Sequence, residues 1–304
     1  MTAVPIVLDC DPGHDDAIAI LLALGSPEVD LLAVTAVAGN APLVDTTANA
    51  IRVLDHAGRP DIPVAAGAAR PLLREPVAAG GTHGDTGLDG PALPAPSRQP
   101  TPEHAIDLIA RLAEEASPTL VATGPLTNVA LLLARHPTAA ERLQRIVLMG
   151  GAIGLGNVTP AAEFNIWADP EAAARVFASG LDVTMVGLDA THQALITREQ
   201  NERLRSRGRS ARLASELVDF YSRAHEHMEG SPIHDAVAVA QVVQPELLEL
   251  TRCHVEVDCS PLSRGRTLVD LHGVTGRAPN ASVATGIDPG FSAFMCDRVA
   301  AAAP

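Results

Sequence analysis

The chain has 304 residues, of which 47% are hydrophobic, and its formal net charge is −14. This length and composition suit the large core of a globular protein. A surface with so much negative charge repels phosphate groups, so we expect no binding to a nucleic-acid polymer. All 22 basic residues are arginines, and the absence of lysine excludes every mechanism that needs one.

We also expect no membrane partner and a cytoplasmic location. The N-terminus lacks the basic stretch and apolar segment that mark a signal peptide. No uninterrupted apolar window approaches the roughly 20 residues of a membrane-spanning helix. The four cysteines are too few for a disulfide framework in a chain of this length, so we expect free thiols.

Six short runs rich in valine, isoleucine and leucine predict β-strands that are buried on both faces of a parallel sheet. They lie at residues 4–8, 31–37, 62–66, 119–122, 146–149 and 183–188. Helical patterns alternate with them at residues 15–24, 45–57, 103–116, 126–135 and 170–179. This alternation predicts an α/β fold with an open, mostly parallel central sheet, a Rossmann-like core and helices on both faces.

Three regions depart from this alternation. Residues 70–102 are crowded with glycine and proline, which predicts a long surface loop. Residues 197–230 are charged and helical in pattern, and we expect them beside the sheet. Residues 253–288 predict a small C-terminal β-hairpin region. Because no linker or repeat is visible, we expect a single domain over residues 1–304.

Polar or glycine-rich residues follow nearly every predicted strand. These segments are residues 9–13, 39–40, 123–125, 150–151 and 189–192. In open parallel sheets, ligands bind in the crevice beyond the carboxyl ends of the strands. The sequence therefore predicts an active site at this edge of the sheet.

Four carboxylates fall within eight residues after the first strand, at Asp9, Asp11, Asp15 and Asp16. Helix capping and the helix dipole account for one or two of them, since Pro12 suits the first position of a helix. Four carboxylates at the inner end of a buried strand repel one another unless a cation is present. Oxygen ligands select Ca²⁺ or Mg²⁺, and no spacing of cysteine and histidine favours zinc.

A metal site of this kind suits two reactions. One is phosphoryl transfer, as in the haloacid-dehalogenase phosphatases, whose strand ends in Asp-x-Asp. The other is activation of a water molecule for attack on carbon. Those phosphatases rely on a downstream lysine, which this chain lacks, and Pro12 stands where their glycine or threonine loop begins. The residues therefore argue against a phosphatase.

The segment from Asp9 to Ala17 closely resembles the signature of the inosine–uridine-type nucleoside hydrolases. Seven further motifs follow in the family's order and at comparable spacing, so the resemblance covers most of the chain and thins after about residue 250. These motifs are Ala38-Gly39-Asn40, His83 to Leu88, Gly124 to Asn128, Met149-Gly150-Gly151, Gly156 to Pro160, Glu163 to Pro170, and His234-Asp235.

This resemblance implies calcium-dependent hydrolysis of the N-glycosidic bond of a small-molecule ribonucleoside, which yields free base and ribose. It implies one Ca²⁺ ion, with the ligands Asp11, Asp16, Asp235 and the backbone carbonyl of Thr127. Asp11 would also take a proton from the attacking water as the general base. Asn40 would help to fix that water or a ribose hydroxyl, and it joins the catalytic set.

The resemblance also implies how the nucleoside is held. Asp15 and Asn165 look placed for the 2′- and 3′-hydroxyls, while Asn157 and Glu163 would hold the 5′-hydroxyl. Breaking the C1′–N bond builds an oxocarbenium-like ribose, which carboxylates and amide oxygens stabilise. His234 would be the acid that protonates the departing base. The substrate-binding candidates are Asp15, Asn40, His83, Met149, Asn157, Glu163, Phe164, Asn165, His234 and Asp235.

Each assignment has a structural alternative. Asn157 by itself is more typical of a turn. Asp169 followed by Pro170 begins a helix, and we keep Asp169 structural. His234 and Asp235 form a common kind of buried pair. These alternatives explain the residues singly but give no reason for the set to meet. A phosphatase and a non-catalytic nucleoside-binding protein stay open as other functions.

Base preference is left open by the sequence. In the family it depends on a loop, here residues 80–89, and on the segment before the His-Asp motif. Tyr221, His225 and His227 are candidates to reach the base, although an ordinary charged helix explains each of them as well. His234 favours the broader inosine/uridine type, and a pyrimidine-preferring enzyme remains open. His14 replaces a commonly aliphatic residue and is unexplained. We expect a homodimer or homotetramer.

Overall fold

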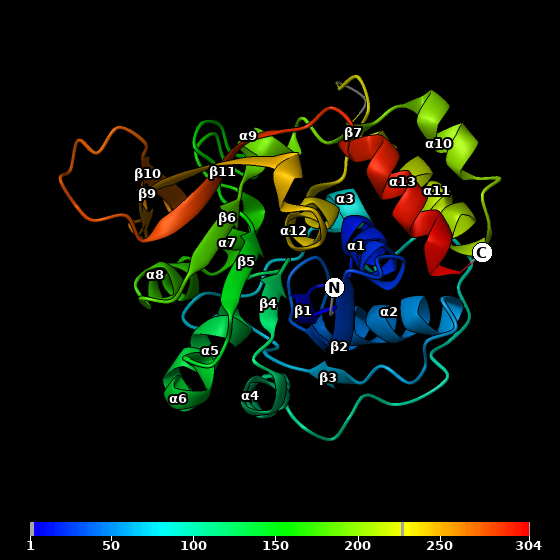
Figure 1. The fold of residues 1–304 in the computed structure, drawn as a ribbon, viewed down its shortest axis with the longest axis horizontal. Coiled ribbons are helices and arrows are strands. Elements are labelled where there is room, and N and C mark those ends of the chain that lie inside the picture. The colour runs from blue at the N-terminus through cyan, green and yellow to red at the C-terminus, as the bar shows by residue number, and fades with distance from the viewer. Residues whose placement is uncertain (1–2, 226–227, 304) are drawn as a thin grey trace.

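The computed structural model describes residues 3–225 and 228–303. Its centre is a nine-stranded sheet in the order β10-β9-β11-β6-β5-β4-β1-β2-β3 (Figure 1). The six predicted strands are present and parallel, as β1 (Val4–Cys10), β2 (Val29–Ala36), β3 (Val64–Ala66), β4 (Thr119–Ala122), β5 (Arg145–Met149) and β6 (Val183–Val186). The prediction of a mostly parallel central sheet is confirmed.

The C-terminal strands extend this sheet. β11 (Ala281–Ile287) pairs in parallel with β6, and β9 (Leu248–Asp258) pairs antiparallel with β11. β10 (Arg266–Asp270) then pairs antiparallel with β9. The predicted hairpin is therefore β9–β10, and it forms the outer edge of the central sheet. A second, short antiparallel pair joins β7 (Leu195–Ile196) to β8 (Ser231–Pro232).

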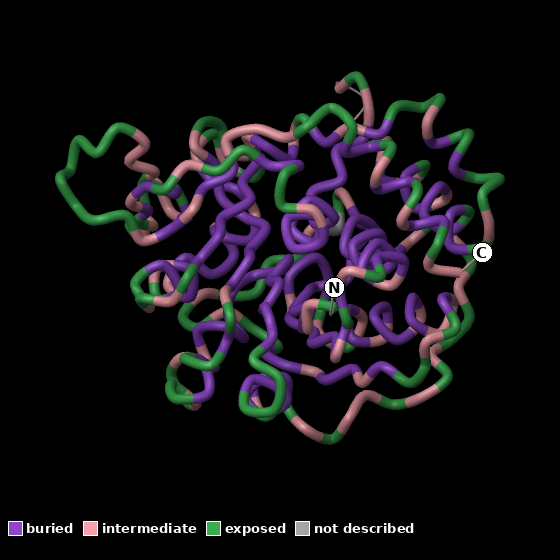
Figure 2. Tube along the Cα trace, viewed as in Figure 1, coloured by how far each residue is buried: buried purple, intermediate pink, exposed green. Residues whose placement is uncertain are grey.

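Helices cover both faces of the sheet (Figures 1 and 2). The predicted helices are α1 (His14–Leu24), α2 (Leu43–His56), α4 (Ala105–Ala116), α5 (Thr127–Arg135) and α8 (Pro170–Phe177). The others are α3 (Gly80–His83), α6 (Pro137–Ala140), α7 (Phe164–Ala168), α9 (Leu188–Thr191), α10 (Arg198–Leu204), α11 (Arg209–Tyr221), α12 (His234–Val243) and α13 (Phe291–Ala302), with 3-10 turns η1 (Ser222–His225) and η2 (Pro245–Leu247).

Alternate residues of β1 face opposite halves of the core. Ile6 and Leu8 belong to a cluster with α1, α2, α11, α12 and α13. Val7 belongs to a second cluster with α4, α5, α6 and α8. A strand that is buried on both faces reads as a continuous apolar run, which is why β1 was recognisable in the sequence.

The boundaries differ from the predictions where local chemistry intervenes. β3 begins at Val64, not at residue 62, because Pro63 has no amide hydrogen to donate to a neighbouring strand. β6 ends at Val186, and Gly187 caps the short helix α9. The charged segment after residue 197 forms α10, α11 and η1, and α11 packs against α1 and α13.

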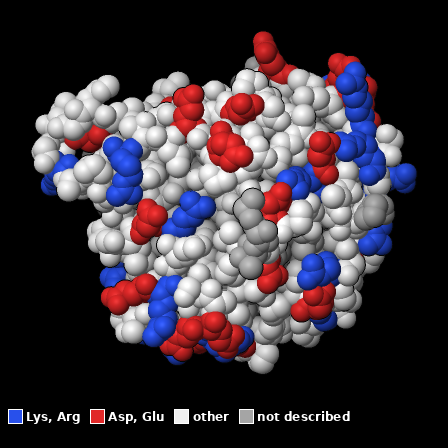
Figure 3. All heavy atoms as spheres, viewed as in Figure 1, with Lys and Arg blue, Asp and Glu red and all other residues white. Residues whose placement is uncertain are grey.

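On the face shown in Figure 3, acidic and basic side chains are interspersed and do not separate into broad patches. Within the described residues, no helix combines the length and the apolar character that crossing a membrane requires.

Candidate active site

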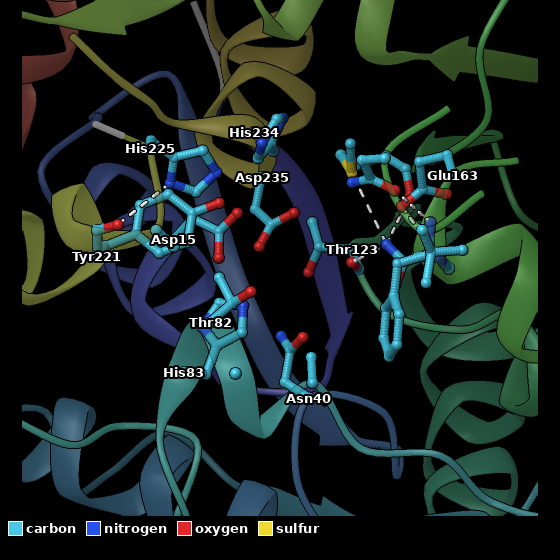
Figure 4. A pocket seen from close by; sticks show the side chains of 18 of the residues that line it. Asp15, Asn40, Thr82, His83, Thr123, Glu163, Tyr221, His225, His234 and Asp235 are labelled. Atoms are coloured by element: carbon cyan, nitrogen blue, oxygen red, sulfur yellow. Dashed lines mark hydrogen bonds between the residues drawn. The ribbon is translucent and has the colours of Figure 1, made fainter. Parts of the chain in front are cut away.

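A cavity of about 640 Å³ opens at the carboxyl ends of the central strands. Its lining comes from the loops after the strands, from the 77–83 segment and from the helical region near residue 225. In Figure 4, Asp235 lies in the middle of the cavity, with Tyr221 and His225 on one side and Glu163 on the other. The substrate-binding candidates thus meet at the predicted edge of the sheet, whereas Asp11 and Asp16 are not among the residues that line the cavity.

Asp11 follows β1 and is completely buried. Its Oδ2 atom accepts a hydrogen bond of 2.6 Å from the backbone amide of Asn40. A Cβ atom would lie 2.0 Å from this carboxylate at Gly39 and 2.7 Å from it at Gly124, so both neighbouring loops need glycine there. Its Oδ1 atom is buried and has no hydrogen-bond partner among the described residues.

Asp16 lies in the first turn of α1 and is held on three sides. It accepts hydrogen bonds from the amide of Gly13 at 2.9 Å, from the Thr123 hydroxyl at 2.8 Å and from Asn40 Nδ2 at 3.2 Å. Asn40 Nδ2 also reaches the backbone carbonyl of Asp11 at 3.2 Å. Asn40 therefore ties the loop after β2 to both aspartates.

Asp15, Asp16 and Asp235 form a compact group in which one carboxylate oxygen of each residue lies within 4.8 Å of the others. α1 and α12 bring them together, because each helix begins with acidic residues in its first turn, where the helix dipole favours negative charge. All three are buried. Burial and, next, the charge of Asp16 raise the pKa of Asp15 to about 8. Burial and the neighbouring aspartates raise the pKa of Asp235 well above its usual range.

These residues fit a hard divalent cation. Among the described residues that line the cavity there is no arginine, and the chain contains no lysine, so neither a guanidinium nor an ammonium group of the lining neutralises the carboxylates. The unpartnered Oδ1 atom of Asp11 is a further buried oxygen beside this group. Several buried carboxylate oxygens without a protein cation are the donor set that Ca²⁺ or Mg²⁺ accepts.

The ligand role predicted for the backbone carbonyl of Thr127 stays a prediction. The Thr127 hydroxyl donates to Asp169 Oδ2 at 2.7 Å, the residue begins α5, and it is not among the described residues that line the cavity. Thr123, by contrast, lines the cavity and donates its hydroxyl to Asp16. Both threonines follow β4 within a few residues, and the sequence alone offered no way to choose between them.

Asp169 is structural, as expected. Its side chain caps α8 by accepting a hydrogen bond from the amide of Ala172. It also accepts the Thr127 hydroxyl and, at 2.8 Å, the amide of Leu72. This carboxylate therefore anchors the 70–102 loop to the core and takes no part in the cavity.

The opposite wall carries the residues expected for the ribose. Glu163 caps α7 and accepts hydrogen bonds from the amides of Asn165, Ile166 and Gly151. Burial outweighs these donors and raises the pKa of Glu163 to about 7. Asn165 Nδ2 donates to the carbonyls of Thr123 at 2.7 Å and Met149 at 3.1 Å, which leaves its carbonyl oxygen for a ligand.

Asn157, Met149 and Phe164 also line the cavity. The Asn157 side chain accepts a hydrogen bond of 3.0 Å from the amide of Phe164, so it supports the loop as well as facing the cavity. The turn role and the binding role considered for Asn157 are therefore compatible in one geometry.

Histidine and tyrosine rings form the third side of the cavity, around His83, Tyr221, His225 and His234. His83 and Tyr221 have ring centroids 5.4 Å apart, and those of Tyr221 and His225 are 4.4 Å apart. His192 completes this side with its ring 5.5 Å from that of His234. His227 lies outside the described residues, so its prediction is untested.

His14 now has a structural explanation. It is completely buried, and its Nε2 atom lies 2.8 Å from the carbonyl of Asp89. Its ring stacks on Phe220 at 4.9 Å and contacts His83 through Nδ1 at 3.1 Å. His14 thus connects the start of α1 to the loop after residue 83 and to the end of α11, and it does not line the cavity.

Sequence reasoning missed several lining residues. Thr123 and His192 stood in polar segments at strand ends but received no role. Thr82 adjoins the His83 to Leu88 motif, Val158 lies within the Gly156 to Pro160 motif, and Met228 ends the segment considered for base recognition, but none of them was given a role. Proximity to a strand-end motif was the signal that would have found most of them.

Comparison with known proteins agrees with this geometry. A family model described as inosine-uridine preferring nucleoside hydrolase matches residues 6–292. A pyrimidine-specific ribonucleoside hydrolase RihA of Shewanella sp. (strain ANA-3) is 50% identical over 99% of this chain and 97% of its own length. The protein of that name from Escherichia coli O8 (strain IAI1) is 49% identical, with 98% of each chain covered. A solved purine-preferring ribonucleoside hydrolase from Gardnerella vaginalis has a TM-score of 0.92 at 33% identity and 98% coverage of each chain.

Proposed function

The chain belongs to the inosine-uridine preferring nucleoside hydrolase family and is a ribonucleoside hydrolase, and we propose that it depends on Ca²⁺ and prefers pyrimidine ribonucleosides. The observation that carries the metal dependence is the group of Asp15, Asp16 and Asp235 at a cavity whose described lining contains neither arginine nor lysine. The pyrimidine preference rests on relatives of that printed specificity at 49–50% identity, against 33% for the purine-preferring structure.

The proposed ligands of the cation are Asp11, Asp16, Asp235 and an oxygen of Thr123. Asp15 is proposed to bind ribose hydroxyls and not the cation, although its carboxylate lies within the same acidic group. When bound, Ca²⁺ supplies Lewis-acid chemistry that makes a water molecule a better nucleophile. Water and ribose hydroxyls would supply the remaining oxygens of the six to eight that Ca²⁺ usually takes.

Asp11 is the proposed general base. The amide of Asn40 holds its Oδ2 atom, while Oδ1 has no partner among the described residues and can accept a proton from the attacking water. Asn40 is thereby a positioning group for this base. Its side-chain amide is already committed to Asp11 and Asp16, which leaves its carbonyl oxygen for water or ribose.

The remaining residues act on the ribose and the base. Asp15 and the Asn165 carbonyl oxygen are proposed for the 2′- and 3′-hydroxyls, and Glu163 for the 5′-hydroxyl. These oxygens also stabilise the positive charge that develops on the ribose as the glycosidic bond breaks. His234 acts on the departing base, and His83, Tyr221 and His225 border the space into which that base fits.

The test uses purified enzyme with uridine, cytidine, inosine and adenosine, with and without a calcium chelator. Free base and ribose are measured by chromatography. We expect pyrimidine nucleosides to be cleaved about tenfold faster than purine nucleosides, which is the discrimination that a few pocket contacts supply. The chelator should stop the reaction and added Ca²⁺ should restore it. Equal rates in chelator would refute the metal dependence, and faster inosine cleavage would refute the base preference.

A parallel assay with p-nitrophenyl phosphate addresses the phosphatase alternative, for which we expect no turnover. Metal binding without cleavage of any nucleoside would favour the non-catalytic binding protein. A homodimer or homotetramer and a cytoplasmic location stay predictions from the sequence.

A further inference from the structure

Thr191 and His234 contact each other behind the wall of the cavity. Thr191 is the last residue of α9, and His234 is the first residue of α12. The Thr191 hydroxyl lies 2.7 Å from Nδ1 of His234. His234 lines the cavity, whereas Thr191 is 0% exposed and is not one of the lining residues. The ring of His234 therefore faces the cavity, and Thr191 contacts this ring from the protein interior.

Counting hydrogen-bond groups gives this contact a direction. The Thr191 hydroxyl carries one proton, and among the described residues its hydrogen-bond partner is His234 Nδ1. If the hydroxyl donates, its proton is satisfied and Nδ1 is the acceptor. If Nδ1 donates instead, a buried hydroxyl proton is left without an acceptor, which is costly. The geometry thus favours a proton on Nε2 and none on Nδ1.

The same count applies to the number of protons on the ring. A doubly protonated ring would donate from both nitrogens and would leave the Thr191 hydroxyl proton without an acceptor, so the contact fits a ring that carries one proton. In a neutral imidazole one nitrogen donates and the other accepts, and the partner of one nitrogen decides which is which. Because Thr191 occupies Nδ1, the ring edge that carries Nε2 is the one left for the cavity.

We propose that Thr191 is a positioning residue that donates its hydroxyl proton to Nδ1 of His234, so that Nε2–H of the neutral ring donates a hydrogen bond to the departing base. This inference rests on the proposed function, which assigns His234 to the leaving base. It changes the expected role of His234 from a proton donor to a hydrogen-bond donor.

The electron and proton balance of the step is simple. The C1′–N bond breaks, and its electron pair goes to the base, where a ring carbonyl shares the negative charge. The Nε2–H group stabilises that charge through a hydrogen bond, in the way that a preorganised donor stabilises an oxyanion. His234 keeps its proton throughout, and the released base takes a proton from water. His234 thus needs no reprotonation between turnovers.

The first experiment compares two substrates with different leaving groups. Uridine has a poor leaving group that needs stabilisation, whereas p-nitrophenyl β-ribofuranoside releases a stable phenolate that does not. In Thr191→Val the ring loses its fixed tautomer, and we expect kcat for uridine to fall about five- to tenfold, as the loss of one hydrogen bond implies. KM for uridine and kcat for the phenyl riboside should change less than about twofold.

Two variants serve as controls. Thr191→Ser keeps the hydroxyl and should restore most of the uridine activity. Thr47→Val removes another buried helical hydroxyl, one that donates to the Leu43 carbonyl in α2, and should leave both substrates unaffected. His234→Ala should reproduce the dependence on the leaving group with a larger loss for uridine.

A second measurement does not depend on activity. Long-range ¹H–¹⁵N correlation of the wild-type protein reports which ring nitrogen of His234 carries the proton, with His234→Gln used to assign the signals. We expect protonated Nε2 in the wild type and a mixture of tautomers in Thr191→Val. This readout also holds if Thr191→Val folds poorly, since the wild-type spectrum alone is decisive.

The outcomes separate the two proposals. A wild-type ring protonated on Nδ1, or equal losses of Thr191→Val on both substrates, overturns the role of Thr191. If His234→Ala shows the leaving-group dependence and Thr191→Val does not, the inference fails while the proposed role of His234 stands. If neither variant shows it, both fail. A wild-type enzyme that cleaves no riboside refutes the proposed function and this inference with it.

Discussion

The Thr123 hydroxyl donates a hydrogen bond of 2.8 Å to Asp16 Oδ1, across 107 positions of the chain. It joins the loop after β4 to the first turn of α1, the helix that also carries Asp15. The carbonyl of Thr123 is engaged as well, since it accepts a hydrogen bond of 2.7 Å from Asn165 Nδ2. One threonine thus connects the acidic side of the cavity to the ribose side.

This relationship predicts different effects for two nearby substitutions. Thr123→Val removes a hydrogen bond to a carboxylate, and we expect Ca²⁺ to bind about tenfold more weakly. Thr127→Val removes a bond to Asp169 and should lower the melting temperature while leaving Ca²⁺ affinity within about twofold. Isothermal titration calorimetry on both variants measures the difference. Weaker Ca²⁺ binding in Thr127→Val than in Thr123→Val would return Thr127 to the ligand set.

The metal-free protein should lose stability as the pH rises. Burial raises the pKa of Asp9 to about 6, of Glu163 to about 7 and of Asp15 to about 8. Each folded-state pKa lies above the unfolded value near 4, so the folded state binds more protons between these values. Stability is therefore highest below about pH 4 for these groups and declines through about pH 8.

Thermal unfolding in chelator from pH 5 to pH 8 checks this expectation. The melting temperature should fall across that range, and saturating Ca²⁺ should reduce the decline, because a bound cation favours the charged form of the nearby Asp15 carboxylate and of the proposed ligands. A melting temperature that rises with pH in chelator would contradict this account of the acidic group.

Asp235→Asn should separate stability from activity. The substitution removes one of several buried like charges, so we expect the metal-free protein at pH 8 to melt at a higher temperature than the wild type. Stabilisation by Ca²⁺ should disappear, and kcat should fall by about three orders of magnitude, as expected when preorganised charge at a reaction centre is lost. Scanning calorimetry and the uridine assay give the two readouts.

Glu114→Gln is the matched control for this change. Glu114 is an exposed residue of α4, and its substitution removes one negative charge far from the cavity. It should alter neither the response to Ca²⁺ nor the uridine rate. If Asp235→Asn behaves like Glu114→Gln, the proposed ligand role of Asp235 is wrong.

Glu163→Gln tests the contact with the 5′-hydroxyl. We expect kcat/KM for uridine to fall about tenfold and kcat/KM for 5′-deoxyuridine to stay nearly constant, because the second substrate lacks the group that Glu163 holds. The variant should also melt at a lower temperature, since the Glu163 carboxylate accepts three backbone amides at the start of α7. Equal losses on both substrates would show that Glu163 acts only as a helix cap.

Much of the architecture was predictable from local pattern. The six parallel strands and five of the helices lie where apolar runs and helical periodicity placed them, with shifts of a few residues at their ends. β3 is shorter than predicted because Pro63 has no amide hydrogen. The sixth strand ends before its predicted boundary because Gly187 caps α9, which begins at Leu188. Such details depend on hydrogen-bond geometry that periodicity does not carry.

The carboxyl ends of parallel strands share one edge of a sheet, so the motifs at those ends sufficed to predict that the carboxylates of the first strand and helix, the strand-end amides and the His-Asp pair lie together. The choice between two threonines as the partner of Asp16, the surroundings of His14 and the contact of Thr191 with His234 became visible only in the folded chain. These contacts join residues distant in the chain through side-chain directions, and side-chain directions are set by packing and not by spacing along the sequence.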